Sequence, residues 1–71
     1  MRTIDVKDMG KSDEKGNIIN RTIAGKSTET KPTEYFEDIP LREGDVYIEA
    51  NTGKCYMYEE SDNTWNALGG A

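Results

Sequence analysis

The chain has 71 residues and a net charge of −5, and 34% of its residues are hydrophobic. Only 11 residues are Ile, Leu, Val or Phe, which is fewer than ordinary globular domains carry, so a large aliphatic core and a multidomain enzyme are excluded. A core this small leaves a net stability of no more than about 3–5 kcal/mol unless a disulfide, a metal or a partner adds to it.

Two of these three supports lack the residues that they need. Cys55 is the one cysteine and the chain has no His, so neither an intrachain disulfide nor a four-ligand structural zinc site can form. Cys55 is expected to be a small buried strand residue, and we predict no catalytic residues, no metal and no cofactor. Contact with a partner is therefore the expected support, either in a homo-oligomer or by docking onto a larger assembly.

The charge is distributed unevenly along the chain. Residues 1–33 carry seven Lys or Arg and five Asp or Glu, while residues 34–71 carry two and nine. Because nucleic-acid binding relies on Lys and Arg, we expect no direct contact with nucleic acid. The acidic half is either a solvated surface that keeps the protein soluble or one side of an electrostatically oriented contact between subunits.

No apolar run approaches the length of a membrane span, and the first residues do not resemble a signal peptide. We therefore expect synthesis in the cytoplasm and no contact with a membrane.

The N-terminal third carries the pattern of two strands. Residues 2–8 place Ile4 and Val6 on one face and polar side chains on the other, as in a half-buried strand. Residues 9–16 are polar apart from Met9 and contain two glycines, which predicts a turn, and the β-branched residues of 17–24 predict a second strand. Since an isolated two-stranded ribbon is marginal in water, it must lie against the other half of the chain or against a neighbouring molecule.

The middle of the chain has less regular features. Residues 25–34 have no apolar side chain except Pro32, which predicts an extended linker. Residues 35–43 place four apolar side chains around Pro40, and we expect a short helical turn or an irregular plug at the base of a sheet.

The last third shows the clearest alternation. Residues 46–50 and 55–58 alternate in character around a turn in which Gly53 can adopt the left-handed conformation. A polar turn at 60–63 then leads to a strand at 64–68. The pattern predicts a three-stranded antiparallel meander.

The predicted fold class is mainly β: an N-terminal β-ribbon and a C-terminal three-stranded antiparallel meander, small and stabilised by oligomer contacts. We divide the chain into a ribbon or docking arm at 1–24, an extended linker at 25–34 and a meander module at 35–71.

The aromatic residues of the meander allow two interpretations. Tyr47, Tyr56, Tyr58 and Trp65 form the core of a chain that is poor in aliphatic residues, or they form an exposed strip that stacks on sugars or bases. The period of the pattern does not decide between them.

One segment of the chain also carries a resemblance. Residues 44–60, with their Gly-Asp-x-Tyr start, Thr-Gly-Lys turn, Tyr-x-Tyr strand and the Trp65 that follows, resemble a hairpin that recurs in small bacteriophage and prophage virion proteins. Residues 27–33 are similar to the segment that precedes this hairpin in the same proteins. The structural and interaction residues that we assign are Tyr47, Ile48, Gly53, Tyr56, Tyr58 and Trp65.

The resemblance implies a non-enzymatic virion subunit of the head-decoration, fibre-base or head-tail accessory type. It implies homo-oligomer contacts, with a trimer expected from the habits of such proteins, and a capsid or connector protein as the platform. Two alternatives remain open: a glycan- or host-surface-binding module of a fibre, and an acidic inhibitor of a host protein.

Overall fold

The computed structural model describes residues 1–68, which form a mainly β molecule of 34 × 21 × 18 Å. No helix in these residues is long and apolar enough to span a membrane. The strands are β1 (Arg2–Asp13), β2 (Gly16–Gly25), β3 (Tyr35–Phe36), β4 (Ile39–Pro40), β5 (Val46–Glu49), β6 (Cys55–Glu59) and β7 (Thr64–Ala67). The predicted mainly β fold, with an N-terminal ribbon and a C-terminal antiparallel meander, is confirmed.

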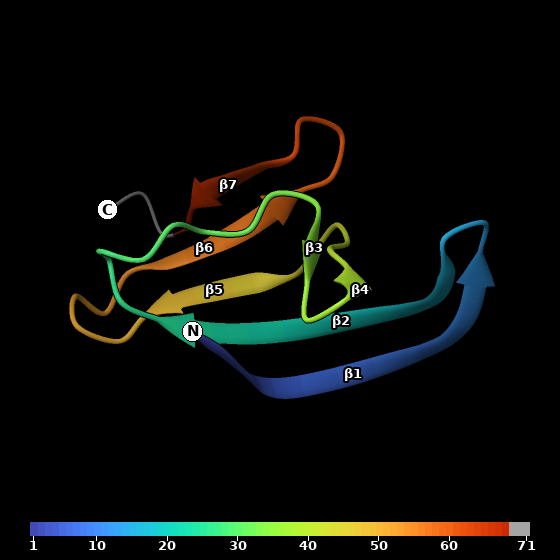
Figure 1. Cartoon of the computed structure of the whole chain (residues 1–71), viewed down its shortest axis with the longest axis horizontal. Coiled ribbons are helices and arrows are strands. Elements are labelled where there is room, and N and C mark those ends of the chain that lie inside the picture. The colour runs from blue at the N-terminus through green and yellow to red at the C-terminus, as the bar shows by residue number, and fades with distance from the viewer. Residues whose placement is uncertain (69–71) are drawn as a thin grey trace.

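The larger sheet has the strand order β1-β2-β5-β6-β7, and β3 and β4 form a separate two-stranded sheet (Figure 1). The pairs β1–β2, β5–β6 and β6–β7 are antiparallel, as the ribbon and the meander require. The pair β2–β5 is parallel, with Thr22 opposite Val46 and Gly25 opposite Glu49. The N-terminal ribbon and the meander are therefore parts of one continuous sheet.

The parallel pair explains the long middle segment. Parallel neighbours cannot be joined by a tight turn and need a crossover of about a dozen residues or more. Residues 26–45 provide this crossover, which runs over one face of the sheet and contains β3 and β4 (Figure 1). The segment predicted as a linker thus forms the second layer of the molecule.

The ribbon differs from its predicted form. The expected turn at residues 9–16 is wrong in extent, because β1 continues to Asp13 and only residues 14 and 15 form the turn. An irregularity between Asp8 and Ser12, where Gly10 has a φ of 70°, lets the ribbon bend without ending.

The prediction of a half-buried first strand is also wrong. Ile4 and Val6 are 50% and 57% exposed. A second irregularity, between Thr3 and Asp5, breaks the alternation. β1 is in addition an edge strand that no second layer covers along most of its length.

Residues 35–43 contain a hairpin in place of the expected helical turn or plug. Glu37 and Asp38 link β3 to β4 with φ values of 55° and 64°, the two positive values of a type I′ turn. The Arg21 guanidinium on β2 donates hydrogen bonds to the carbonyls of Phe36 (2.7 Å) and Ile39 (3.0 Å). These bonds attach the hairpin to the sheet.

Asp45 organises the start of the parallel pair. Its carboxylate is fully buried and accepts hydrogen bonds from the backbone amides of Arg21 and Arg42 and from the Asn20 side chain, each at 3.0 Å. One side chain thus connects β2, the end of the crossover and β5.

The core is small and aromatic. Its fully buried apolar residues are Ile23, Leu41, Tyr47 and Tyr58, with Phe36, Tyr56 and Trp65 packed at its margin. Of the predicted meander module, residues 69–71 lie outside the described part of the chain.

Candidate functional site

Four of the six assigned residues meet on one face of the sheet. Tyr47 and Tyr58 are buried, Tyr56 and Trp65 are partly buried, and the Trp65 ring lies 5.9 Å from the Tyr47 ring and 5.0 Å from the Tyr58 ring, centroid to centroid. These separations and the tilted planes are those of stabilising aromatic pairs. We call this side, with Ile23, the covered face.

The crossover segment binds the polar ends of these aromatic residues. The Tyr47 hydroxyl donates to the Lys26 carbonyl (3.2 Å), the Tyr58 hydroxyl to the Thr33 carbonyl, and Trp65 Nε1 to the Pro32 carbonyl (2.7 Å). A strip held in this way cannot offer the faces of all its rings to sugars or bases, so the geometry favours the core interpretation.

An ion pair closes the other end of the covered face. Lys31 Nζ lies 3.1 Å from the buried Glu49 carboxylate and over the ring of Tyr56, 4.2 Å from its centroid. The pKa of Glu49 is lowered from its ordinary value, mainly by the hydrogen bond from the Thr52 hydroxyl and further by Lys31. Glu49 therefore remains charged and keeps Lys31 folded over the aromatic residues.

The opposite side of the sheet is apolar over β5 and β6, carries Arg2, Asp5 and Glu59 at its margin, and has no second layer within residues 1–68. Cross-strand partners share a face, so the registers place one group of residues together: Ala24, Val46, Ile48, Cys55, Met57 and Leu68. We call this group the open face. Met57 and Leu68 are 38% and 39% exposed, and the other four are partly buried.

The remaining assigned residues lie elsewhere. Ile48 is on the open face, so the structure separates it from the aromatic residues. Gly53 occupies the β5–β6 turn with a φ of 78°, as predicted for a left-handed turn glycine. Cys55 is in a strand as expected, but it is only partly buried.

Sequence reasoning identified the two alternating sets of residues in the meander but not which set was covered. The covering segment comes from residues 26–42, and the polar composition of its first part, residues 26–34, gave no sign that it packs on the sheet. The open face was therefore missed, although the apolar side chains at alternate positions 46, 48, 55 and 57 were its signal.

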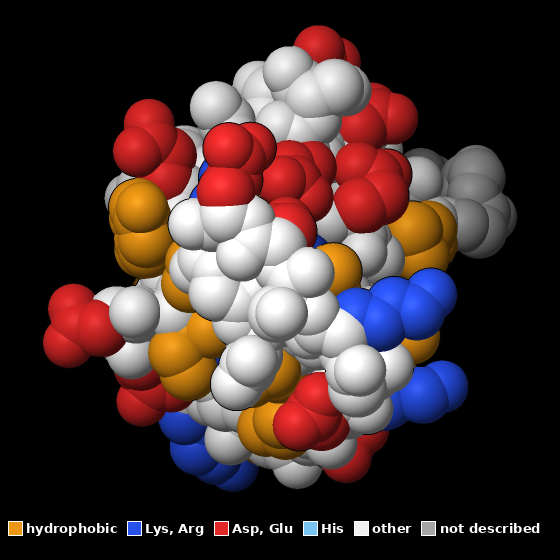
Figure 2. Space-filling model, turned by 90° about the vertical axis from the view of Figure 1, so that its right-hand side faces the viewer, with side chains coloured by type: hydrophobic (Ala, Val, Ile, Leu, Met, Phe, Trp, Pro, Cys, Tyr) orange, Lys and Arg blue, Asp and Glu red, His pale blue; other side chains and the backbone are white. Residues whose placement is uncertain are grey.

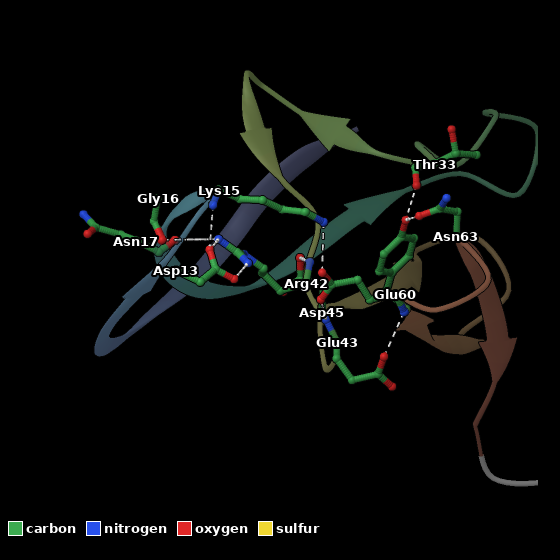
Figure 3. A network of polar contacts seen from close by, with 11 residues as sticks. Asp13, Lys15, Gly16, Asn17, Thr33, Arg42, Glu43, Asp45, Glu60 and Asn63 are labelled. Atoms are coloured by element: carbon green, nitrogen blue, oxygen red, sulfur yellow. Dashed lines mark hydrogen bonds and ion pairs between the residues drawn. The ribbon is translucent and has the colours of Figure 1, made fainter.

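The bent ribbon tip is fastened to the meander by two ion pairs (Figure 3). Arg42 Nη2 donates to Asp13 at 2.8 Å, and Lys15 Nζ lies 3.0 Å from Glu60. The Arg42 hydrogen bond lowers the pKa of Asp13, and the Lys15 hydrogen bond lowers the pKa of Glu60. Both carboxylates are thus kept charged near neutral pH, and the tip stays against the loops of the meander.

Within the described residues, no three His, Cys, Asp or Glu side chains are grouped so that they could hold a metal ion. Comparison with known proteins gave no significant match to any family model, curated protein or solved structure.

Proposed function

We propose that this protein is a non-enzymatic structural subunit of a phage or prophage particle, and that it attaches to neighbouring copies or to a capsid or connector protein through the open face. The observation that carries the proposal is an apolar sheet face without a covering layer in a molecule whose described residues, 1–68, include only four fully buried apolar side chains. Stable domains bury the apolar faces of their sheets between layers.

The composition of the open face is that of an interface. Its centre holds Val46, Ile48 and Met57, while the same side of the sheet carries Thr22 and Asn66 at positions paired with them. An apolar centre with a polar rim is the common anatomy of protein interfaces. Burying this centre would also add the apolar area that a chain of this length lacks.

The assignment to a virion rests on the resemblance of residues 44–60 and Trp65 to hairpins of small phage proteins. The role of a decoration, fibre-base or head-tail accessory subunit follows from that resemblance, as do a trimeric state and a location in the particle.

The first test is the abundance of the chain in particles purified by density from the strain that encodes it. We expect quantitative mass spectrometry to detect it in a fixed ratio to the major capsid subunit. A high ratio indicates head decoration, and a few copies per particle indicate the neck, fibre base or tail. Expression in the cell with absence from purified particles would contradict the proposal.

A matched pair of variants tests the role of the open face. Met57 on this face and Met9 on the ribbon are similarly exposed, at 38% and 41%. We expect Met57→Lys to abolish self-association and incorporation into particles, because a buried lysine without a partner opposes the contact. Met9→Lys should leave both unchanged. Light scattering after size-exclusion chromatography reports the oligomeric state, and equal incorporation of both variants would rule out the open face as the interface.

A further inference from the structure

A hollow with a volume of about 190 Å³ lies where the ribbon tip meets the β3–β4 hairpin and the β6–β7 turn. We call it the tip pocket. It is lined by Lys15, Glu34, Tyr35, Pro40, Leu41, Tyr58 and Asn63. These residues come from three regions of the sequence, so the pocket exists only in the folded chain.

Hydrogen bonds and an ion pair hold the walls of the tip pocket in place. Lys15 is tied to Glu60 at 3.0 Å, and the Tyr58 hydroxyl, which donates to the Thr33 carbonyl, also lies 2.7 Å from the side-chain amide of Asn63 (Figure 3). Side chains fixed in this way lose little freedom when a ligand binds.

The pocket combines one available aromatic ring with unused polar groups. Tyr35 is 58% exposed, the most exposed of the large hydrophobic residues in the described chain. The Glu34 carboxylate has no hydrogen-bond partner among residues 1–68, and the Asn63 amide and the Lys15 ammonium have hydrogen-bonding capacity beyond their contacts with Tyr58 and Glu60. A ring face beside separate donors and acceptors suits a ligand with both C–H and O–H groups.

The charges around the pocket select against anions. Glu34 lies in its wall, and the charge of Lys15 is offset by Glu60. Asp and Glu side chains gather over the upper part of this end of the molecule (Figure 2). A phosphate or carboxylate would meet this negative field, whereas a neutral ligand would not.

We propose that the tip pocket binds a neutral pyranose sugar, with the ring stacked on Tyr35 and its hydroxyls bonded to Lys15, Glu34 and Asn63. The pocket has room for roughly a dozen water-sized groups, about the number of non-hydrogen atoms in a hexose. This site differs from the aromatic strip that the sequence analysis considered for sugar binding. In that strip, the Tyr47 and Tyr58 hydroxyls and the Trp65 indole nitrogen are bound to the crossover. It also lies on the other side of the sheet from the open face, so it does not depend on the proposed assembly role.

The test is an amide-detected NMR titration of the isotope-labelled full chain with glucose, galactose, N-acetylglucosamine and rhamnose, and with glucose 6-phosphate as the anionic comparison. We expect saturable shifts at Lys15, Tyr35 and Asn63 with at least one neutral sugar, and weaker binding of the phosphorylated one. Tyr35→Ala should weaken binding at least about fivefold. Met9→Ala, at an exposed ribbon residue that does not line the pocket, should not change it.

Glu34→Gln provides a second variant in case Tyr35→Ala perturbs the hairpin, since it keeps the size of an exposed side chain and removes its charge. We expect Glu34→Gln to weaken the binding of neutral sugars and to reduce the discrimination against glucose 6-phosphate. The proposal would be overturned by the absence of saturable shifts up to about 100 mM of every neutral sugar. Shifts that persist unchanged in Tyr35→Ala, or a preference for the phosphorylated sugar, would overturn it as well.

Discussion

At the scale of single residues, the position of Tyr47 depends on a glycine. Gly25 lies at the end of β2, where an added Cβ would fall against the Tyr47 hydroxyl, 3.0 Å from its Cζ and 3.1 Å from Glu29 Oε1. The space that a side chain would occupy is filled by the buried phenol, which bonds the Lys26 carbonyl. Gly25 is therefore needed for close approach, and no unusual φ is involved.

We predict that Gly25→Ala lowers the free energy of unfolding by about 1–3 kcal/mol, the usual cost of overfilling a packed site. Urea unfolding followed by tryptophan fluorescence measures the loss. The double variant Gly25→Ala/Tyr47→Phe should recover part of it relative to the Tyr47→Phe background, because the atom met first by the new methyl group is gone. Equal losses in both backgrounds would mean that the hydroxyl is not the obstacle.

At the scale of elements, the β3–β4 hairpin contains the least favourable backbone in the described chain. Glu37 and Asp38 both adopt left-handed φ values, which favour Asn and Gly over ordinary residues. The Glu37 side chain also accepts a hydrogen bond from the Thr3 hydroxyl at 2.9 Å, whereas Asp38 is exposed and makes no hydrogen bond with its side chain among residues 1–68.

Asp38→Gly should therefore stabilise the protein by about 0.5–1 kcal/mol, since the relief of the left-handed conformation exceeds the entropy that glycine adds to the unfolded chain. Asp38→Ala should destabilise it, because alanine keeps the strain and lacks the tolerance of Asp for this region. Thermal unfolding of the two variants beside the parent gives the comparison. If glycine and alanine shift the midpoint in the same direction, backbone strain is not the controlling factor.

At the scale of the whole molecule, carboxylates fasten the parts of the chain that β-pairing does not join. Asp13 and Glu60 hold the ribbon tip, Glu29 pairs with the N-terminal ammonium at 2.9 Å, and Glu49 holds Lys31 over the core. In each case a hydrogen bond from the partner lowers the pKa of the carboxyl group, and for Glu49 the Thr52 hydroxyl has the largest effect.

A carboxyl group whose pKa is lowered in the folded state stabilises the fold fully at pH values above its ordinary pKa, which is 4.5 for Glu49 and 3.8 for Asp13. This stabilisation is lost as the pH falls through the lower pKa of the folded state. We predict a constant free energy of unfolding from neutral pH to about pH 5 and a decline below about pH 4. Urea unfolding at a series of pH values measures it.

The Glu49→Gln variant separates the contribution of Glu49 to the pH dependence of stability from that of Asp13. The Glu49 side chain is 6% exposed, against 40% for Asp13, so solvent and salt screen it least. The Glu49→Gln variant should be less stable at neutral pH and should lose less stability on acidification than Asp13→Asn. A steeper acid decline in Glu49→Gln than in the parent protein would contradict this assignment.

The meander was predictable because its determinants are local. Alternation at residues 46–50 and 55–58, with a left-handed glycine at Gly53, specifies a hairpin from neighbours in sequence. The length of the ribbon was not predictable, because the same polar stretch contains both the bend at Gly10 and the turn at residues 14 and 15, and the sequence does not show which of them ends the strand. The two-residue turn at Glu37 and Asp38 was missed because its residue types do not favour it, and it forms with the help of the Arg21 bonds to flanking carbonyls.

Of the candidate site, the sequence indicated the aromatic residues but not their environment. The fate of Tyr47 and Tyr58 depends on which face residues 26–42 cover, and that segment has no apolar periodicity of its own. Its first part, residues 26–34, is held by backbone carbonyls that bind Tyr47, Tyr58 and Trp65, and such contacts leave no mark in the side-chain pattern. The tip pocket escaped prediction because its walls come from three distant parts of the sequence and meet through long-range contacts such as Lys15 with Glu60 and Tyr58 with Thr33.

By itself, the sequence determined that this protein is a small β protein with an N-terminal ribbon, a C-terminal meander and too few aliphatic residues for a large aliphatic core. Periodicity and composition carry that information because they act between near neighbours. The tertiary structure alone decided that β2 pairs in parallel with β5, that the polar crossover covers the aromatic face, and that the face of Ile48 and Met57 stays open. These outcomes depend on pairings between residues more than twenty positions apart, such as those of Asp45 with Arg21 and Arg42 with Asp13, which no local pattern encodes.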